Sequence, residues 1–215
     1  MARDPDLNGG GLRRSRLRRS GVDRAHARMG AVGEQMARML RNDWYLDEPD
    51  LQEARLRCLR ILDRFNATQA DDDEQRRLLL GRLVAGLGHE AVVMPRFQCS
   101  YGSQITLGAR SFVNHDGLFM DDAVIEIGED VRIGPRVQLL TATHPVEDHE
   151  RRRAGWERPL PIVVGSNAWL GGGVIVCPGV TIGENAVVGA GSVVTRDVPA
   201  QVLAVGNPAR VVREI

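Results

Sequence analysis

Length, composition and charge set the first limits on what this chain can be. Its 215 residues include 28 basic and 28 acidic side chains, so the zero net charge predicts no general attraction to nucleic acid or membranes. All 28 basic residues are arginines, which excludes chemistry that needs a lysine nucleophile. The three cysteines lie far apart, and no apolar run resembles a membrane span or a signal peptide. We therefore predict a cytoplasmic protein without a disulfide framework or a cysteine-based zinc site.

The first segment, residues 1–28, is a basic N-terminal arm. It holds eight arginines and three aspartates around a run of three glycines. This composition predicts a disordered arm; the alternative is an arm that binds nucleic acid or an acidic partner. No aromatic side chains alternate with the arginines, which favours the first interpretation.

Residues 29–89 are predicted to form an N-terminal helical module. Asp47 is the expected N-cap of one helix, which carries an amphipathic stripe of leucine, isoleucine and phenylalanine up to Asn66. A second helix is expected to begin at the aspartates of residues 71–73 and to end near Gly86.

Residues 90–215 follow a repeat of six residues. Aliphatic side chains recur at Val164, Leu170, Val176, Ile182, Val188 and Val194. Four residues after each comes a small or β-branched residue, and glycine directly follows four of the six. A period of six fits neither a helix nor an ordinary alternating strand. It is typical of a parallel β-helix, in which each unit is a short strand and a turn stacked on its neighbours.

The repeat register breaks once. Leu139 and Val164 are 25 residues apart, one more than a multiple of six. The polar stretch 145–161 is therefore predicted to leave the solenoid as an inserted loop, of the kind that often lies on a binding face. The tail from Gly206 onward is expected to form a turn and a closing strand or short helix that caps the β-helix.

Several motifs together resemble one family. They are Tyr101-Gly102-Ser103, Asp121-Asp122, Thr143-His144-Pro145-Val146, residues 167–173, residues 189–195 and Gly206-Asn207-Pro208-Ala209-Arg210-Val211. Together with the helical stretch from Asp43, they resemble the maltose/galactoside O-acetyltransferases of the hexapeptide-repeat acyltransferase superfamily. The resemblance implies a left-handed β-helix, although the usual crossover rule predicts right-handed coils. It also implies acetyl-CoA as co-substrate, no metal, and a homotrimer with active sites between subunits.

His144 is the candidate catalytic residue. Acetyl transfer from a thioester to a hydroxyl needs a base, and imidazole changes its protonation near neutral pH. His144 stands where the register breaks, before a proline, which places it on a rim and not in the core. The resemblance implies that it takes the proton of the acceptor hydroxyl and then returns a proton to the coenzyme A thiolate. A lone histidine can also be structural, but this motif favours catalysis.

The resemblance also implies an acceptor site for a sugar or similar polyol. Its matching positions are Asp47, Arg55, Ser103, Asn114 and Asp122. Asp122 is expected to hold an acceptor hydroxyl, whereas Asp47 has the alternative role of a helix N-cap and Arg55 that of a solvated helix face. Phe112 stands where the galactoside enzymes have tyrosine, so the identity of the sugar stays open.

The positions that match the family's coenzyme groove come from the later repeats and the tail. They are Trp169, Gly172, Ala190, Thr195, Arg196, Arg210 and Arg213. The resemblance places Trp169 beside the pantetheine arm and makes the backbone N–H of Gly172 a donor to the oxyanion. Arg210 and Arg213 match residues that meet the coenzyme's phosphates, for which a guanidinium group is well suited.

Other functions remain open at this stage. A zinc enzyme resembling the γ-type carbonic anhydrases would use His115, His144 and His149, but the spacing from His115 to His144 is not a whole number of 18-residue coils. A non-catalytic scaffold would make the N-terminal arm the functional element. Within the acyltransferases, serine or antibiotic acetyltransferase activity and a non-sugar acceptor are the alternatives.

Overall fold

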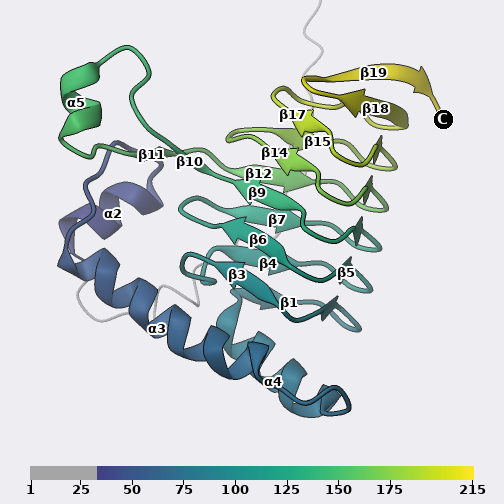
Figure 1. The fold of residues 1–215 in the computed structure, drawn as a ribbon, viewed down its shortest axis with the longest axis horizontal. Helices are drawn as coiled ribbons and strands as arrows, with labels where there is room; N and C mark the ends of the chain where they lie inside the picture. The colour runs from purple at the N-terminus through teal and green to yellow at the C-terminus, as the bar shows by residue number, and fades with distance from the viewer. Residues whose placement is uncertain (1–32) are drawn as a thin grey trace, which may run out of the picture.

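The computed structural model describes residues 33–215, and the predicted N-terminal arm lies outside the described residues. The chain forms a parallel β-helix with short helices at its N-terminal end (Figure 1). None of the described helices is long and apolar enough to cross a bilayer. The fold class predicted from the six-residue period is therefore confirmed.

Three helices precede the solenoid: α2 Glu34–Leu40, α3 Pro49–Asn66 and α4 Asp73–Leu83. Asp72 caps α4, because its side chain accepts a hydrogen bond from the backbone N–H of Gln75. The predicted N-cap role of Asp47 is wrong. With Pro49 in the first turn of α3, the N-cap position falls on Glu48, and Asp47 instead pairs with an arginine described below.

The β-helix has three faces, and each face is one sheet of stacked parallel strands, which β19 alone joins in the antiparallel direction among the described strands. The first sheet contains β1 Gly86–Leu87, β4 Ile105–Leu107, β7 Ile125–Ile127, β12 Ile162–Val164 and β15 Thr181–Ile182. The second contains β2 Val92–Val93, β5 Phe112–Val113, β8 Arg132–Ile133, β13 Trp169–Leu170, β16 Val187–Val188, β18 Val202–Gly206 and β19 Ala209–Glu214. The third contains β3 Phe97–Cys99, β6 Gly117–Met120, β9 Gln138–Leu140, β14 Ile175–Val176 and β17 Val193–Val194. Because β1 begins at Gly86, the solenoid starts a few residues before the expected boundary at residue 90.

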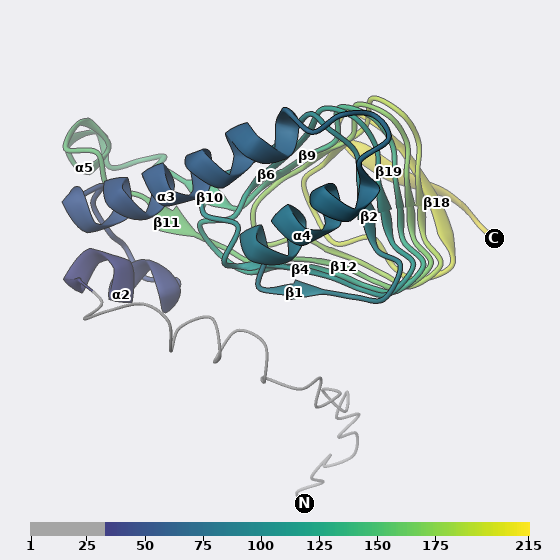
Figure 2. The same ribbon diagram turned by 90° about the horizontal axis from the view of Figure 1, so that it is seen from below.

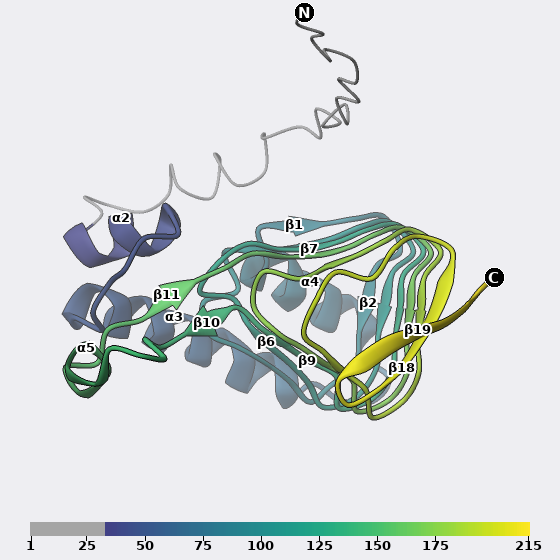
Figure 3. The same cartoon turned by 90° about the horizontal axis from the view of Figure 1, so that it is seen from above.

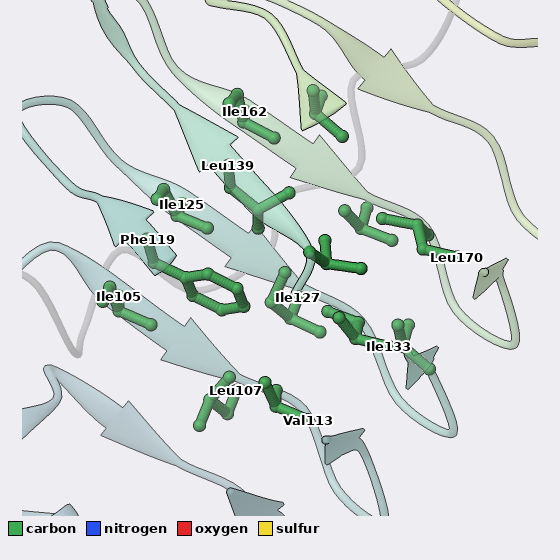
Figure 4. Packing of buried hydrophobic residues seen from close by; sticks show 14 of the residues in the cluster. Ile105, Leu107, Val113, Phe119, Ile125, Ile127, Ile133, Leu139, Ile162 and Leu170 are labelled. Atoms are coloured by element: carbon green, nitrogen blue, oxygen red, sulfur yellow. The ribbon is translucent and has the colours of Figure 1, made fainter. Parts of the chain in front are cut away.

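The core is a column of aliphatic side chains inside these faces. Val164 pairs with Ile182 in the first sheet and Leu170 with Val188 in the second, so this coil takes 18 residues. The earlier coils are longer and pair residues 20 apart, as Leu107 does with Ile127. These side chains are fully buried, and Figure 4 shows how neighbours of the same cluster stack from coil to coil. Burial of each such side chain stabilises the fold by ~1.5–3 kcal/mol.

Helices α3 and α4 close the first coil. Leu79 and Leu83 of α4 and Phe65 of α3 belong to the same buried cluster as Val93 and Phe97 of the first coil. Figure 2, which looks along the solenoid from this end, shows both helices lying across the coil's opening. At the other end β18 and β19 pair antiparallel, so the predicted cap is a strand.

Turns at the three corners join the sheets. The asparagine corner, between the first and second sheets, includes Asn167 and Asn185, which both adopt positive φ. The Asn167 amide donates a hydrogen bond to Asn185 Oδ1 at 2.7 Å. The glycine corner, between the second and third sheets, comprises residues 114–116, 134–137, 171–174 and 189–192. Asparagine tolerates the left-handed conformation better than most residues, which suits it to these stacked turns.

The loop corner, between the third and first sheets, contains the predicted insertion. Its turns are residues 100–104 and 121–124, followed by the inserted loop, residues 141–161. In this loop β10 Ala142–Thr143 pairs antiparallel with β11 Arg158–Pro159, and α5 His149–Arg153 lies at the tip. Figures 1 and 3 show the loop projecting from the solenoid toward α2 and the start of α3.

Candidate active site

Most predicted acceptor residues gather at the loop corner. Successive coils contribute Ser103 from the first turn, Asp122 from the second and His144 from the inserted loop. The start of α3 lies beside them and supplies Arg55, with Asp47 just before the helix. The repeat geometry explains this grouping, because turns that follow strands of the same sheet stack at the same corner.

His144 is exposed at the base of the inserted loop, immediately after β10. Its Nδ1 lies 3.2 Å from the carbonyl oxygen of Trp156. Since a carbonyl oxygen can only accept, Nδ1 must carry the hydrogen, and the neutral ring then keeps the lone pair of Nε2 free to accept a proton. This contact selects the tautomer that a general base needs.

A buried polar cluster lies at the same corner and connects the second turn, the inserted loop and the N-terminal module. The hydroxyl of Tyr45 is 3.1 Å from Asp122 Oδ1 and 2.7 Å from Glu157 Oε2, and the Ser100 hydroxyl donates to Asp122 Oδ2 at 3.3 Å. Burial raises the pKa of the Asp122 carboxyl, whereas the hydrogen bond that it accepts from Tyr45 acts to lower this pKa. Burial likewise raises the pKa of Tyr45, so the phenol keeps its proton.

The adjacent Asp121 is completely buried. Its carboxylate accepts hydrogen bonds from the backbone N–H groups of Tyr101 at 2.8 Å and Gln104 at 3.2 Å, and so holds the turn that carries Ser103. Burial raises the pKa of Asp121 to about 7, although these N–H donors act in the opposite direction.

Asp47, Arg55 and Tyr101 form a chain of contacts beside this cluster. Arg55 donates to both carboxylate oxygens of Asp47 at 2.6 Å and to the Tyr101 hydroxyl at 2.8 Å. Desolvation lowers the pKa of Arg55, but its hydrogen bond to Asp47 and its contacts with Tyr101 outweigh this effect and raise the pKa overall. The arginine is therefore held by partners and is not a freely solvated helix residue.

Asn114 lies elsewhere. It follows β5, at the glycine corner, where its side chain accepts the backbone N–H of His115 at 2.7 Å. Strand β6 runs across the third face between Asn114 and Asp121, and its four residues span about 13 Å. One subunit therefore does not bring Asn114 together with His144.

The predicted coenzyme residues lie mainly on the second sheet and the glycine corner. Trp169 is 55% exposed on the second sheet. Cross-strand pairs run from Trp169 to Val187, then to Leu203 and Arg213, so an apolar strip ends at a guanidinium group. Arg210 lies on the same final strand.

Gly172 and Ala190 stack at the glycine corner, whereas Thr195 and Arg196 follow β17 at the loop corner. Within residues 33–215, the backbone N–H of Gly172 donates no hydrogen bond to another backbone group. Within one chain, the predicted coenzyme residues are therefore distributed over the second sheet, the glycine corner and the loop corner.

Sequence reasoning missed the residues that hold the site together. Tyr45, Ser100, Trp156 and Glu157 were not assigned roles, although Tyr45 belonged to the motif that carried the resemblance. The Trp156 carbonyl has no signature in the sequence, because every residue has one. Nothing in the sequence indicates that the carboxylates of Asp122 and Glu157 lie close together. Their proximity results from the contact that both make with Tyr45.

The histidines that a zinc site would use lie in different parts of the structure. In the described part of the chain, no three histidine, cysteine or carboxylate side chains are grouped to hold an ion. His115 lies at the glycine corner, whereas His144 and His149 lie in the inserted loop. The residues required for the zinc alternative are therefore not assembled within one subunit.

A hexapeptide β-helix that carries a histidine loop at one corner defines the class of hexapeptide-repeat acyltransferases. Family comparisons agree: residues 38–88 match the maltose acetyltransferase hexapeptide capping motif, and residues 161–196 match the bacterial transferase hexapeptide model of six repeats. The chain is 42% identical to galactoside O-acetyltransferase of Escherichia coli K12, over 77% of this chain and 81% of the relative.

Solved structures show the same relationship. A maltose O-acetyltransferase from Clostridium difficile 630 superposes with a TM-score of 0.83 at 40% identity, covering 86% of this chain and 98% of that one. A galactoside acetyltransferase in complex with coenzyme A gives a TM-score of 0.81 at 39% identity, covering 85% and 92%. The chain belongs to the maltose/galactoside O-acetyltransferase family.

Proposed function

We propose that this protein transfers the acetyl group of acetyl-CoA to a hydroxyl of a sugar or similar polyol, with His144 as general base. The observation that carries the proposal is the contact between His144 Nδ1 and the Trp156 carbonyl, which leaves Nε2 unprotonated. The relatives named galactoside and maltose O-acetyltransferases, and the complex with coenzyme A, support the same reaction class.

The reaction proceeds by direct attack. His144 Nε2 takes the proton of the acceptor hydroxyl as its oxygen bonds to the thioester carbonyl carbon, and the Gly172 N–H donates to the oxyanion. The carbon–sulfur bond then breaks, and the imidazolium returns the proton to the coenzyme A thiolate. The products are an acetyl ester and free coenzyme A, and no covalent enzyme intermediate is needed.

The acceptor is held by polar side chains of the loop corner. Asp122 accepts a hydrogen bond from an acceptor hydroxyl, and Ser103, Asp47 and Arg55 provide further polar groups for a polyol. The Asp47–Arg55 ion pair supports this arrangement, since its 2.6 Å contacts hold both groups in place before the acceptor binds.

The coenzyme lies along the second sheet. The pantetheine arm packs on Trp169 and on the apolar strip beside it, and Arg210 and Arg213 pair with the phosphates. Ala190, Thr195 and Arg196 complete the groove. The exposed position of Trp169 supports this role, because an exposed tryptophan has a large apolar face available to a ligand.

The active sites are expected between the subunits of a homotrimer. Within one chain, His144 lies at the loop corner, whereas Asn114 and Gly172 lie at the glycine corner, on the other side of the third face. A complete site therefore needs the glycine corner of a neighbouring copy. A closed ring repeats this contact at every interface. We also place the protein in the cytoplasm, consistent with its three free cysteines.

Free thiol release from acetyl-CoA, measured against a panel of sugars and non-sugar alcohols with chelator present, tests the reaction. Wild type should release thiol only with a suitable acceptor, and His144→Ala should lower the rate by a factor of about 10²–10⁴ without changing the melting temperature. Release that persists in the variant would overturn the role of His144. Loss of activity in chelator would favour the zinc alternative, and an active non-sugar alcohol would change the acceptor class.

Mixed oligomers test the shared site. His144→Ala and Asn114→Ala subunits should each be inactive alone, and random mixing into trimers should restore about a quarter of wild-type activity, because one interface of each mixed trimer is intact. No recovery in mixtures shown by light scattering to be trimeric would place both residues in the same subunit's site.

A further inference from the structure

The inserted loop contacts the N-terminal helical module through a small group of residues around Tyr45 and Glu157. Tyr45 and Glu157 form an antiparallel bridge, in which the Tyr45 N–H donates to the Glu157 carbonyl at 2.9 Å and the Glu157 N–H to the Tyr45 carbonyl at 3.0 Å. The Arg158 side chain adds a hydrogen bond to the Asn42 carbonyl at 3.2 Å. The residue before this bridge, Trp156, is the one whose carbonyl contacts His144.

Aromatic contacts reinforce the bridge. The guanidinium group of Arg151 lies 4.8 Å from the ring centroid of Trp44 and 4.9 Å from that of Trp156, so it contacts aromatic rings from both the module and the loop. Arg38 of α2 lies 5.7 Å from the Trp156 ring. Cation–π contacts of this kind contribute ~0.5–1 kcal/mol each at exposed sites.

The Tyr45 hydroxyl occupies the centre of the attachment. It has one hydrogen and faces two carboxyl groups, Glu157 at 2.7 Å and Asp122 at 3.1 Å. The shorter contact goes to the loop, and the longer one to the carboxyl group that we assign to the acceptor. The fully buried Tyr45 therefore joins the segment that orients the base to the residue that holds the acceptor.

The loop needs this attachment. Its helix α5 buries no side chain, and within residues 33–215 its strand pairing consists of the two-residue contact of β10 with β11 and the bridge from Glu157 to Tyr45. Such a segment has few contacts to fix its conformation, so the position of the Trp156 carbonyl depends on what holds residues 156 and 157.

We propose that Tyr45 is a positioning residue for the catalytic base: its hydroxyl and backbone hold Glu157, and thereby fix the Trp156 carbonyl that selects the orientation and tautomer of His144. This inference rests on the proposed function only in taking His144 as the base. On this inference, the N-terminal helical module contributes to the active site in addition to covering the first coil of the solenoid.

The tautomer of His144 provides a readout independent of activity. Nitrogen-15 NMR of the full chain, with the His144 signals identified by their loss in His144→Ala, should show the Nδ1–H form in wild type. Tyr45→Phe removes only the hydroxyl and should give a mixture of the two tautomers. Its kcat should fall about tenfold or more, because a displaced base loses its alignment, while KM for acetyl-CoA stays unchanged.

Two further variants separate positioning from general destabilisation. Glu157→Gln keeps an acceptor for the Tyr45 hydroxyl and should retain most of the wild-type kcat and the Nδ1–H tautomer, whereas Glu157→Ala should behave like Tyr45→Phe. Asn66→Ala is the matched control, because it removes two half-buried contacts with the backbone of Phe97, both 2.8 Å, far from the loop. It should lower the melting temperature but leave kcat and the tautomer unchanged.

Unchanged kcat and tautomer in Tyr45→Phe would overturn the inference, as would a similar loss of kcat in Asn66→Ala. These results are distinguishable from failure of the proposed function, which would appear as full activity in His144→Ala.

Discussion

The coils of the β-helix and the loop corner hold their residues in place in different ways. In the coils Val164 stacks on Ile182, and the same kind of contact recurs between Val176 and Val194 on the third sheet, again 18 residues apart. At the loop corner Tyr45 contacts Glu157, 112 residues away, and no other pair of residues repeats that contact in the described chain. The comparison teaches that a regular scaffold can fix where a site lies, whereas single, non-repeated contacts determine its chemistry.

The largest effect, on stability, is expected from a charge placed in the aliphatic core of the coils. Val188→Asp places a carboxylate at a fully buried position with apolar neighbours above and below. An unpaired buried charge is strongly destabilising, by about 4 kcal/mol or more, so the variant should lose the cooperative unfolding transition measured by circular dichroism. A folded variant with near-normal melting would show that the coils tolerate local defects. His144→Ala, at the loop corner, should by contrast lose activity and keep its fold.

A smaller effect is expected at the end of the apolar strip on the second sheet. Arg213→Ala should raise KM for acetyl-CoA roughly tenfold, the value of one charge-assisted contact, and leave kcat and KM for the acceptor nearly unchanged. Initial rates with each substrate varied separately measure this split. A change confined to KM for the acceptor would contradict the assignment of the coenzyme phosphates to β19.

The buried carboxyl at the loop corner should make stability depend on pH. Asp121 binds a proton more tightly when folded, with a pKa of about 7, than when unfolded, with its ordinary value of 3.8. Its contribution to stability is therefore present at low pH and declines as pH rises from about 4 to about 7, then levels off. The slope of melting temperature against pH in that window should be less negative in Asp121→Asn than in wild type. Identical slopes would show that Asp121 stays ionised in the fold.

The smallest effect should appear at the asparagine corner. Asn185→Ala removes the 2.7 Å contact with Asn167 and puts alanine at a φ of 58°. We expect a loss of about 1–2 kcal/mol in the free energy of unfolding and no change in kcat, measured by denaturant titration beside the activity assay. Asn185→Gly, which removes the contact but relieves the backbone, should recover part of that loss.

The sequence predicted the scaffold better than the site, for physical reasons. Val164 and Val188 were assigned to the core because a period of six allows few other structures. The start of α4 near Asp72 was predictable because a cap acts within one turn. The cap at Asp47 was wrong because its true partner, Arg55, competes for the carboxylate.

The organisation of the loop corner could be predicted only in part. The break in register located the loop and His144, and the resemblance supplied Asp122. The contact of Tyr45 with both carboxyl groups depends on how a helical module packs against a loop far along the chain, which no local pattern encodes. The Trp156 carbonyl is a backbone group, and its contact with His144 can be seen only in the three-dimensional structure.

The final strand has a consequence for self-assembly. A stack of parallel strands has open ends, and such edges can add further chains and grow into fibres. Helices α3 and α4 cover one end, and β19 reverses direction at the other and carries Arg210, Arg213 and Glu214 along the outer edge. A reversed, charged edge matches poorly with another parallel coil, so we expect β19 to disfavour end-to-end growth of the solenoid.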